Sequence, residues 1–110
     1  MNLPYAERAR VERKKIAEYL LSPSHPDGSS KARFFSRFGF AVAQWAILAE
    51  ALKNHGRTHP VVSSVESKHG TRYTVDGHLH TPDGREPRIR TVWMLPKNSK
   101  SPRLITAYPI

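Results

Sequence analysis

Apolar residues in the first half of the chain recur at the spacing of α-helices. From Glu12 to Leu21 the apolar side chains fall on one helical face, and the charged ones lie mainly opposite. Proline disfavours helix at the residue before it, so Ser22-Pro23 ends this helix and begins a loop rich in Pro, Gly and Ser. Two further helices are predicted, the first from Ser30 to Phe38 and the second from about Val42 to Asn54.

The ends of these two helices are marked by serine and glycine. Ser29 or Ser30 is expected to cap the first, and Gly39 is expected to end it in a left-handed conformation. Gly56 is expected to end the second helix. The apolar stripe of that helix consists of Val42, Trp45, Ala46, Leu48, Ala49 and Leu52.

After His59-Pro60 the pattern becomes that of β-strands. Residues 61–65 are a β-branched run, and residues 72–80 alternate so that Tyr73, Val75, Gly77 and Leu79 share one face. A Pro-Asp-Gly-Arg turn follows at 82–85. Two more strands are predicted, a central one over Arg88–Leu95 and a last one over Arg103–Tyr108.

This order of elements predicts an α+β fold. About three N-terminal helices would pack on a three- to four-stranded antiparallel sheet formed by the C-terminal half. The length of 110 residues fits a single domain over 1–110, with a helical part over about 12–56 and a sheet part over 61–109.

Charge adds information about partners. Eighteen Lys and Arg oppose nine Asp and Glu, which gives a formal net charge of +9 and a pI near 10.4. Such a charge favours nucleic acid first, an anionic membrane second and an acidic protein third. No apolar run is long enough to span a bilayer and no secretory signal is present, so the cytoplasm is the expected location and no membrane partner is predicted.

The loop from His25 to Lys31 is the first candidate for chemistry. A histidine in a Pro/Gly loop is exposed and can exchange protons near neutral pH. The following helix would offer unpaired N–H groups to an anion, and Lys31 and Arg33 would add positive charge. Together these residues would form a phosphate pocket with an acid or base beside it. An ordinary loop with a surface histidine explains the pattern equally well.

The strands carry a second set of candidates. Arg88 and Arg90 are two residues apart and project from the same face, where they could bind a phosphate in bidentate fashion. Arg72 and Arg103 lie on other strands of the same sheet. Solvated surface arginines are the alternative interpretation.

The last strand offers two hydroxyls, because Thr106 and Tyr108 share a face and could orient a scissile phosphate. Both residue types are also ordinary strand formers that need no function.

No metal site is predicted. His55 and His59 are four residues apart, but Gly56 is expected to break the helix between them. His78 and His80 share a strand face and have no third ligand at a fixed spacing. The absence of cysteine removes the ligand sets of most structural zinc sites. Trp45 and Trp93 sit among apolar neighbours and are interpreted as core residues.

Several strings in the chain resemble a family of short bacterial proteins known mainly as a domain of unknown function. They cover nearly the whole chain and occur in the order His25-Pro26-x-Gly28-x-x-Lys31-Ala32, Gly70-x-x-Tyr73-x-Val75-x-Gly77-x-Leu79, Pro82-Asp83-Gly84-Arg85, Arg90-Thr91-Val92-Trp93 and Pro102-Arg103-Leu104-Ile105-Thr106-Ala107-Tyr108-Pro109. The resemblance implies a toxin-like component encoded beside a small partner protein.

A second resemblance is to the superfamily of metal-independent nuclease toxins that includes barnase, EndoU, the tRNA-cleaving colicins and RelE. That resemblance implies a His or Lys on the helical side, an Arg on a middle strand and hydroxyls on the last strand. His25 and Lys31, Arg90, and Thr106 with Tyr108 occupy those places here.

These observations favour an endoribonuclease toxin that cleaves RNA, either tRNA or mRNA, by attack of the 2′-OH and needs no cofactor. His25 would be the acid or base, Lys31 and Arg90 would stabilise the phosphate, and Thr106 and Tyr108 would orient it or transfer protons. Further RNA contacts would come from Arg33, Arg72, Arg88 and Arg103. A small acidic antitoxin or immunity-like protein would be the second partner. The rival hypothesis is a non-catalytic basic module that binds nucleic acid or an acidic protein.

Overall fold

The computed structural model describes all 110 residues, and it confirms an α+β architecture with a meander sheet. The four antiparallel strands are β1 (Val61–Ser67), β2 (Gly70–His78), β3 (Arg88–Pro96) and β4 (Arg103–Pro109), in the spatial order β1-β2-β3-β4. The predicted strand over 88–95 is thus an inner strand, as expected. The strand expected to reach His80 ends at His78, although Leu79 beyond it is buried.

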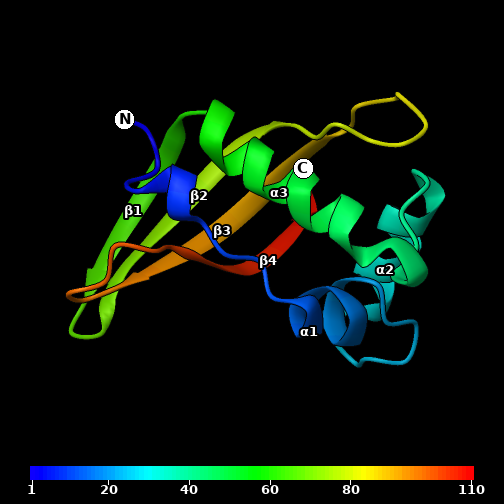
Figure 1. Ribbon diagram of the computed structural model, residues 1–110, viewed down its shortest axis with the longest axis horizontal. Helices are drawn as coiled ribbons and strands as arrows, with labels where there is room; N and C mark the ends of the chain where they lie inside the picture. The colour runs from blue at the N-terminus through cyan, green and yellow to red at the C-terminus, as the bar shows by residue number, and fades with distance from the viewer.

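Three helical segments precede the sheet (Figure 1). α1 (Arg13–Lys15) continues into a π-helical turn over Ile16–Leu20, so the predicted helix over 12–21 is present with a widened second half. α2 (Ser29–Arg37) and α3 (Trp45–Thr58) follow. Gly39 ends α2 with φ +101°, as predicted. None of the helices is both long and apolar enough to cross a membrane.

Two expectations about α3 are wrong. The helix passes through Gly56 and ends at Thr58, because a Cβ at position 56 would lie 2.8 Å from the Trp93 ring. Gly56 therefore allows close packing of α3 on β3 and does not end the helix. Two residues expected in the apolar stripe are exposed: Ala46, and Val42, which is 46% exposed because it belongs to a 3-10 turn that precedes α3.

The core lies between α3 and one face of the sheet. Tyr73 and Val75 of β2 and Ile89 and Trp93 of β3 are buried on that face, opposite Leu48 and Leu52 of α3. The β2–β3 register pairs Tyr73 with Trp93 and Val75 with Thr91, so the alternation predicted from the sequence sets which face is covered.

The N-terminal segment closes the core in a way the sequence pattern did not predict. It begins at β1, where the Val61 N–H donates to the Met1 carbonyl, and it crosses to β4, where the Leu104 N–H donates to the Arg10 carbonyl (Figure 1). The segment buries four of its own apolar side chains against the core: Leu3, Ala6, Ala9 and Val11. This segment positions α1 and its π-helical turn beside β4, which builds the pocket described next.

Candidate active site

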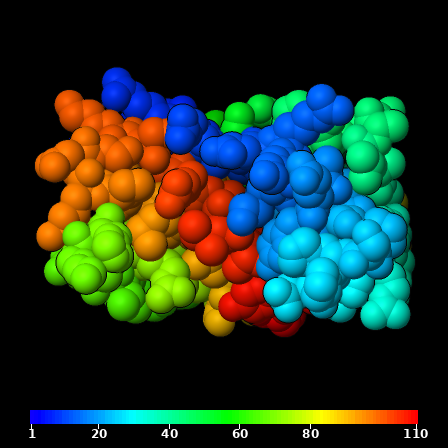
Figure 2. Space-filling model, turned by 90° about the horizontal axis from the view of Figure 1, so that it is seen from below, coloured from blue at the N-terminus to red at the C-terminus, as the bar shows by residue number.

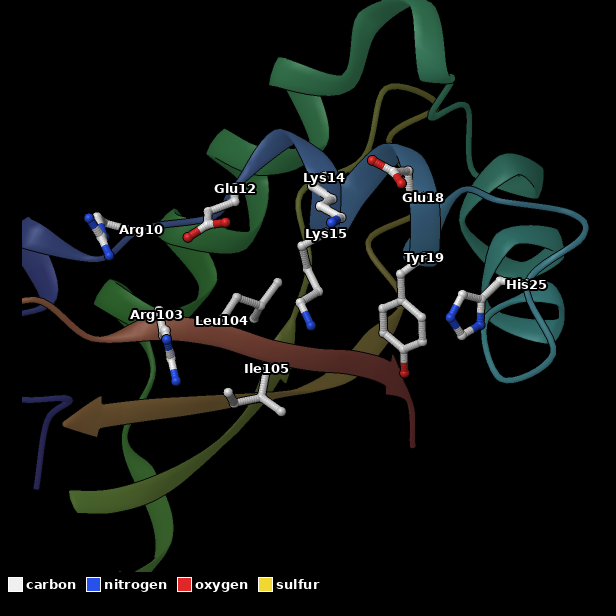
Figure 3. Close-up of a pocket in the computed structure, with 10 residues that line it drawn as sticks. All are labelled: Arg10, Glu12, Lys14, Lys15, Glu18, Tyr19, His25, Arg103, Leu104 and Ile105. Carbon is white, nitrogen blue, oxygen red and sulfur yellow. The ribbon is translucent and has the colours of Figure 1, made fainter. Parts of the chain in front are cut away.

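A pocket of about 610 Å³ lies between α1, its π-helical turn and strand β4. This volume falls in the range of about 300–1,000 Å³ that is usual for ligand sites. We call it the β4 pocket. It is lined by Arg10, Glu12, Lys14, Lys15, Glu18, Tyr19, His25, Arg103, Leu104 and Ile105 (Figure 3). Figure 2 shows the same region of the surface, where β4 (red) meets the α1 segment and the loop after it (blue to cyan).

Tyr19 joins the helical segment to the last strand. Its hydroxyl lies 3.0 Å from the Thr106 hydroxyl, so the two hydroxyls form a hydrogen bond across β4. Two ammonium groups lie near its ring, Lys15 Nζ at 5.2 Å and Lys31 Nζ at 5.5 Å from the ring centroid. Cations at such distances are attracted by the ring quadrupole. Tyr19 thus gathers two positive charges and a second hydroxyl around one position.

His25 lies beside Tyr19, with ring centroids 5.0 Å apart in an edge-to-face arrangement (Figure 3). Its Nδ1 accepts hydrogen bonds from the backbone N–H groups of Asp27, at 3.0 Å, and Gly28, at 3.1 Å. The Nε2 atom is on the other side of the ring and forms no hydrogen bond with the protein. It is therefore the nitrogen that can act on a ligand in the β4 pocket.

Gly28 holds this loop against Tyr19. A Cβ at position 28 would lie 2.2 Å from the Tyr19 carbonyl oxygen, so no larger residue fits there without displacement of the backbone. The spacing of His25 and Gly28 in the sequence has a physical reason. The glycine N–H binds the imidazole, and because the residue has no side chain its backbone can pack directly on that of the tyrosine.

The beginning of α2 differs from the prediction. Neither Ser29 nor Ser30 caps the helix; the residue before it is Gly28, and no side chain forms a cap hydrogen bond. The N–H groups of Gly28 and Ser29 donate to the His25 carbonyl, at 3.2 and 3.0 Å. These two N–H groups are therefore bound by His25, whereas the N–H groups of Ser30 and Lys31, in the first turn of α2, have no backbone partner, as predicted. Lys31, whose ammonium donates to the Asp27 carbonyl at 3.2 Å, still contributes charge.

Arg90 and Tyr108 form a separate cluster on the sheet face opposite α3. The register pairs Arg90 with Asp76 on one side and Tyr108 on the other. Arg90 donates two hydrogen bonds to the Asp76 carboxylate, from Nε at 2.7 Å and from Nη2 at 2.9 Å. These hydrogen bonds lower the pKa of Asp76 below its usual value and raise the pKa of Arg90 further above its own. The fork expected to bind phosphate is thus bound to a carboxylate.

The other predicted arginines are exposed. Arg88 pairs with His78, and Arg72 and Arg103 flank Met94 from either side, so all three side chains project from the same sheet face as Arg90. Arg103 also lines the β4 pocket. Arg33 is exposed on α2.

The predicted residues therefore fall into two groups. His25, Lys31 and Thr106 gather around Tyr19, and Arg103 lines the other end of the β4 pocket (Figure 3). Arg90 and Tyr108 lie in the next row of the sheet beside Asp76. Sequence reasoning missed Tyr19 and Lys15, which fall on the apolar and charged faces of the predicted helix. A tyrosine among aliphatic residues on a helix next to a His/Gly loop was the signal available.

The histidine pairs considered for a metal bind protein groups. The rings of His55 and His59 lie together, with centroids 4.8 Å apart, because α3 continues through Gly56 and ends at Thr58, the residue before His59. His78 and His80 both bind Glu86, the first at its carbonyl and the second at its carboxylate. No group of three or more His, Asp or Glu side chains lies close enough together to hold a metal ion.

Comparison with known proteins now identifies the family. Residues 2–110 match the domain of unknown function DUF6883, and the chain belongs to this family. No curated protein matches the chain. Its fold is similar to that of a chain in the contact-dependent growth inhibition toxin–immunity protein complex from Klebsiella pneumoniae 342, with a TM-score of 0.74 and 20% sequence identity over 91% of this chain and 98% of the other.

Proposed function

We propose that this protein is an endoribonuclease toxin that cleaves RNA at the β4 pocket by attack of the 2′-OH. The observation that carries the proposal is the convergence around Tyr19 of an imidazole with an open Nε2, a hydroxyl pair and positively charged side chains. The net charge of +9 supports a polyanionic substrate.

The chemistry needs three kinds of group, and the pocket offers each. The 2′-oxygen attacks the adjacent phosphorus and the 5′-oxygen leaves, so negative charge builds on the phosphorane. Lys15, Lys31 and Arg103 supply cations to stabilise that charge. The hydroxyls of Tyr19 and Thr106 orient the phosphate and pass protons, and His25 acts on it through Nε2.

The remaining predicted residues are proposed to hold the RNA beyond the scissile phosphate. Arg90 and Tyr108 lie in the row next to Thr106 on the same sheet face. Arg72 and Arg88 are exposed on that face, and Arg33 is exposed on α2. Asp76 binds the Nε and Nη2 of Arg90, so these two groups are not free to hold the scissile phosphate. We assign the remaining N–H groups of Arg90 to a neighbouring phosphate of the RNA.

The toxin assignment has support from fold and charge. The similar fold in a toxin–immunity protein complex supports a protein that acts together with a small partner. A partner that neutralises a chain of charge +9 would be acidic, and its association would be electrostatically steered and weakened by salt. Fold and charge together favour a toxin with a neutralising partner over a general binding module.

The product ends of cleaved RNA test the proposal. Purified protein incubated with total RNA and EDTA should leave 2′,3′-cyclic or 3′-phosphate ends and free 5′-hydroxyls, since 2′-OH attack needs no added metal. His25→Ala should bind RNA as the parent does and cleave it far more slowly. Products with 5′-phosphates, or activity lost on chelation, would contradict 2′-OH attack. A parent that binds RNA without cutting it would be a binding module.

A further inference from the structure

The Nδ1 atom of His25 has two hydrogen-bond partners in the protein and Nε2 has none, and this difference determines which nitrogen carries the proton. We propose that His25 works as a neutral hydrogen-bond donor through Nε2, and not as the acid or base of the reaction. The inference rests on the proposed function of the β4 pocket.

The position of the proton follows from the two backbone contacts. An N–H group can only donate, so Nδ1 must offer a lone pair to Asp27 and Gly28, at 3.0 and 3.1 Å. A neutral imidazole carries one proton, which is then on Nε2. In this tautomer Nε2–H points away from the loop and presents a donor to the pocket.

The loop cannot easily release Nδ1. The His25 carbonyl accepts the N–H groups of Gly28 and Ser29, and the Gly28 carbonyl accepts the N–H of Ala32 in α2, at 2.8 Å. Gly28 is also in contact with the Tyr19 backbone, where a Cβ would not fit. The acceptor role of Nδ1 is therefore built into the junction between α2 and the π-helical turn.

The surroundings of Nδ1 offer no acceptor for a second proton on this ring. On Nδ1 it would face two N–H groups and break both hydrogen bonds. Lys15 on α1 and Lys31 on α2 place positive charge around the Tyr19 ring, against which the His25 ring packs. Of the nearby carboxylates, Glu18 is directed away from the Tyr19 and His25 rings (Figure 3), and Asp27 is exposed to solvent.

A neutral Nε2–H suits the stabilisation of charge. It would donate to a non-bridging phosphoryl oxygen, and this hydrogen bond strengthens as negative charge builds on the phosphorane. The O2′–P bond forms as the P–O5′ bond breaks. The proton lost by the 2′-OH and the proton gained by the 5′-oxygen move through the Tyr19 and Thr106 hydroxyls and water, while the imidazole keeps its own proton. A neutral histidine held by a helix N-terminus as an electrophile is a known device in triosephosphate isomerase.

Nitrogen NMR of the ¹⁵N-labelled parent tests the tautomer without any substrate. We expect the neutral ring of His25, observed at about pH 8, to show an unprotonated Nδ1 and a protonated Nε2, because two backbone N–H groups donate to Nδ1. His69 is exposed and its ring forms no hydrogen bond with the protein, so no contact fixes its tautomer and it serves as the control. A proton on Nδ1 of the neutral ring would overturn the proposal.

Three substitutions at one position test the role in catalysis. His25→Ala should lower the cleavage rate by about 10²–10³, the usual effect of removing one such donor. His25→Asn keeps an acceptor for the loop N–H groups but has no donor at Nε2, so it should be as slow as His25→Ala. His25→Gln carries an amide N–H that can reach the Nε2 position and should recover at least about tenfold over His25→Ala.

The outcomes separate the role of His25 from the function of the protein. If the parent cleaves RNA and His25→Gln is as slow as His25→Ala, the donor role is wrong and an acid or base role is correct. If His25→Ala cleaves at the parental rate, the site does not use His25. If the parent cleaves no RNA, the proposed function fails, and the NMR spectrum alone then confirms or rejects the neutral tautomer.

Discussion

His25 and His55 both accept hydrogen bonds at Nδ1, but His25 lies in a half-buried loop and His55 lies in the core. His55 lies in α3 with 1% of its surface exposed, and its Nδ1 accepts from the Thr91 hydroxyl at 2.9 Å. The Gly77 carbonyl can only accept, so the proton of the neutral His55 ring is on Nε2 and the Thr91 hydroxyl donates to Nδ1; the Thr91 oxygen also accepts the Trp93 indole N–H, at 2.9 Å. The Nε2–H of His55 then donates to the Gly77 carbonyl at 3.0 Å. Both ring nitrogens of His55 form hydrogen bonds within the protein, whereas the Nε2 of His25 forms none.

The comparison shows how burial separates a histidine whose two ring nitrogens are bound in the core from one that keeps a ring nitrogen without a partner. The hydrogen bonds of His55 connect α3 to β2 and β3 across the core. Both ring nitrogens are used, so the ring has no free donor or acceptor for a substrate. Burial lowers the pKa of His55 to about 4, so this ring is neutral at physiological pH. His25 is neutral by our inference for another reason, the two N–H groups that its loop directs at Nδ1.

Loss of the buried histidine should produce the largest effect on stability. His55→Ala removes a buried ring and leaves the Thr91 hydroxyl and the Gly77 carbonyl without partners, so we expect about 3–5 kcal/mol of lost unfolding free energy. His25→Ala should cost less, about 1–2 kcal/mol, because the ring is only half-buried and water can bind the Asp27 and Gly28 N–H groups in its place. Urea unfolding of both variants measures the difference. Similar losses in the two would mean that the His25 loop is as structural as the core.

The pH dependence of stability should follow His55. The unfolded chain takes up this proton near pH 6.5 and the folded protein only near pH 4, so stability is complete above pH 6.5 and declines as pH falls towards 4. The difference between the two pKa values corresponds to about 3 kcal/mol over this window. Asp76, with its lowered pKa, adds a further loss only at lower pH.

Unfolding midpoints measured in steps from pH 7 to pH 4 would check this dependence. His25→Ala should show the same decline as the parent, and Asp76→Asn should keep it within the window. A flat profile between pH 7 and pH 5 would show that His55 is not a neutral, buried group.

Most of the fold could be predicted from the sequence because its signals are local and periodic. The alternation of Tyr73, Val75 and Gly77 sets which face of β2 is buried, and the apolar residues of α3 select the face that covers it. The errors at Gly56 and at the helix cap have one cause. A glycine can allow close packing or end a helix, and only the position of a distant partner, Trp93 or Tyr19, decides between them.

The site was only partly predictable for the same reason. His25, Lys31 and Thr106 were found from residue type and loop chemistry, and the structure brings them to one tyrosine. The contact that joins them spans 87 residues of sequence, from Tyr19 to Thr106, and no local pattern encodes it. The pairing of Arg90 with Asp76 likewise depends on strand register, which the sequence did not specify.

The Tyr19–Thr106 hydrogen bond provides the smallest and most specific test of the comparison. Tyr19→Phe keeps the ring that packs on His25 and near the two lysines, and it removes only the hydroxyl. We expect about 0.5–1.5 kcal/mol of lost stability, the usual value for one partly buried hydrogen bond. Thr106→Val should cost a similar amount, and the double variant should cost little more than either, because both changes remove the same interaction.

Tyr5→Phe is the control, since Tyr5 is 42% exposed and its hydroxyl forms no hydrogen bond with the protein. Under the proposed function, Tyr19→Phe should also slow RNA cleavage by more than its effect on folding explains, while Tyr5→Phe leaves the rate unchanged. If the two single losses add in the double variant, the hydroxyls are not coupled, and the β4 pocket then lacks the link between helix and strand that distinguishes it from the core.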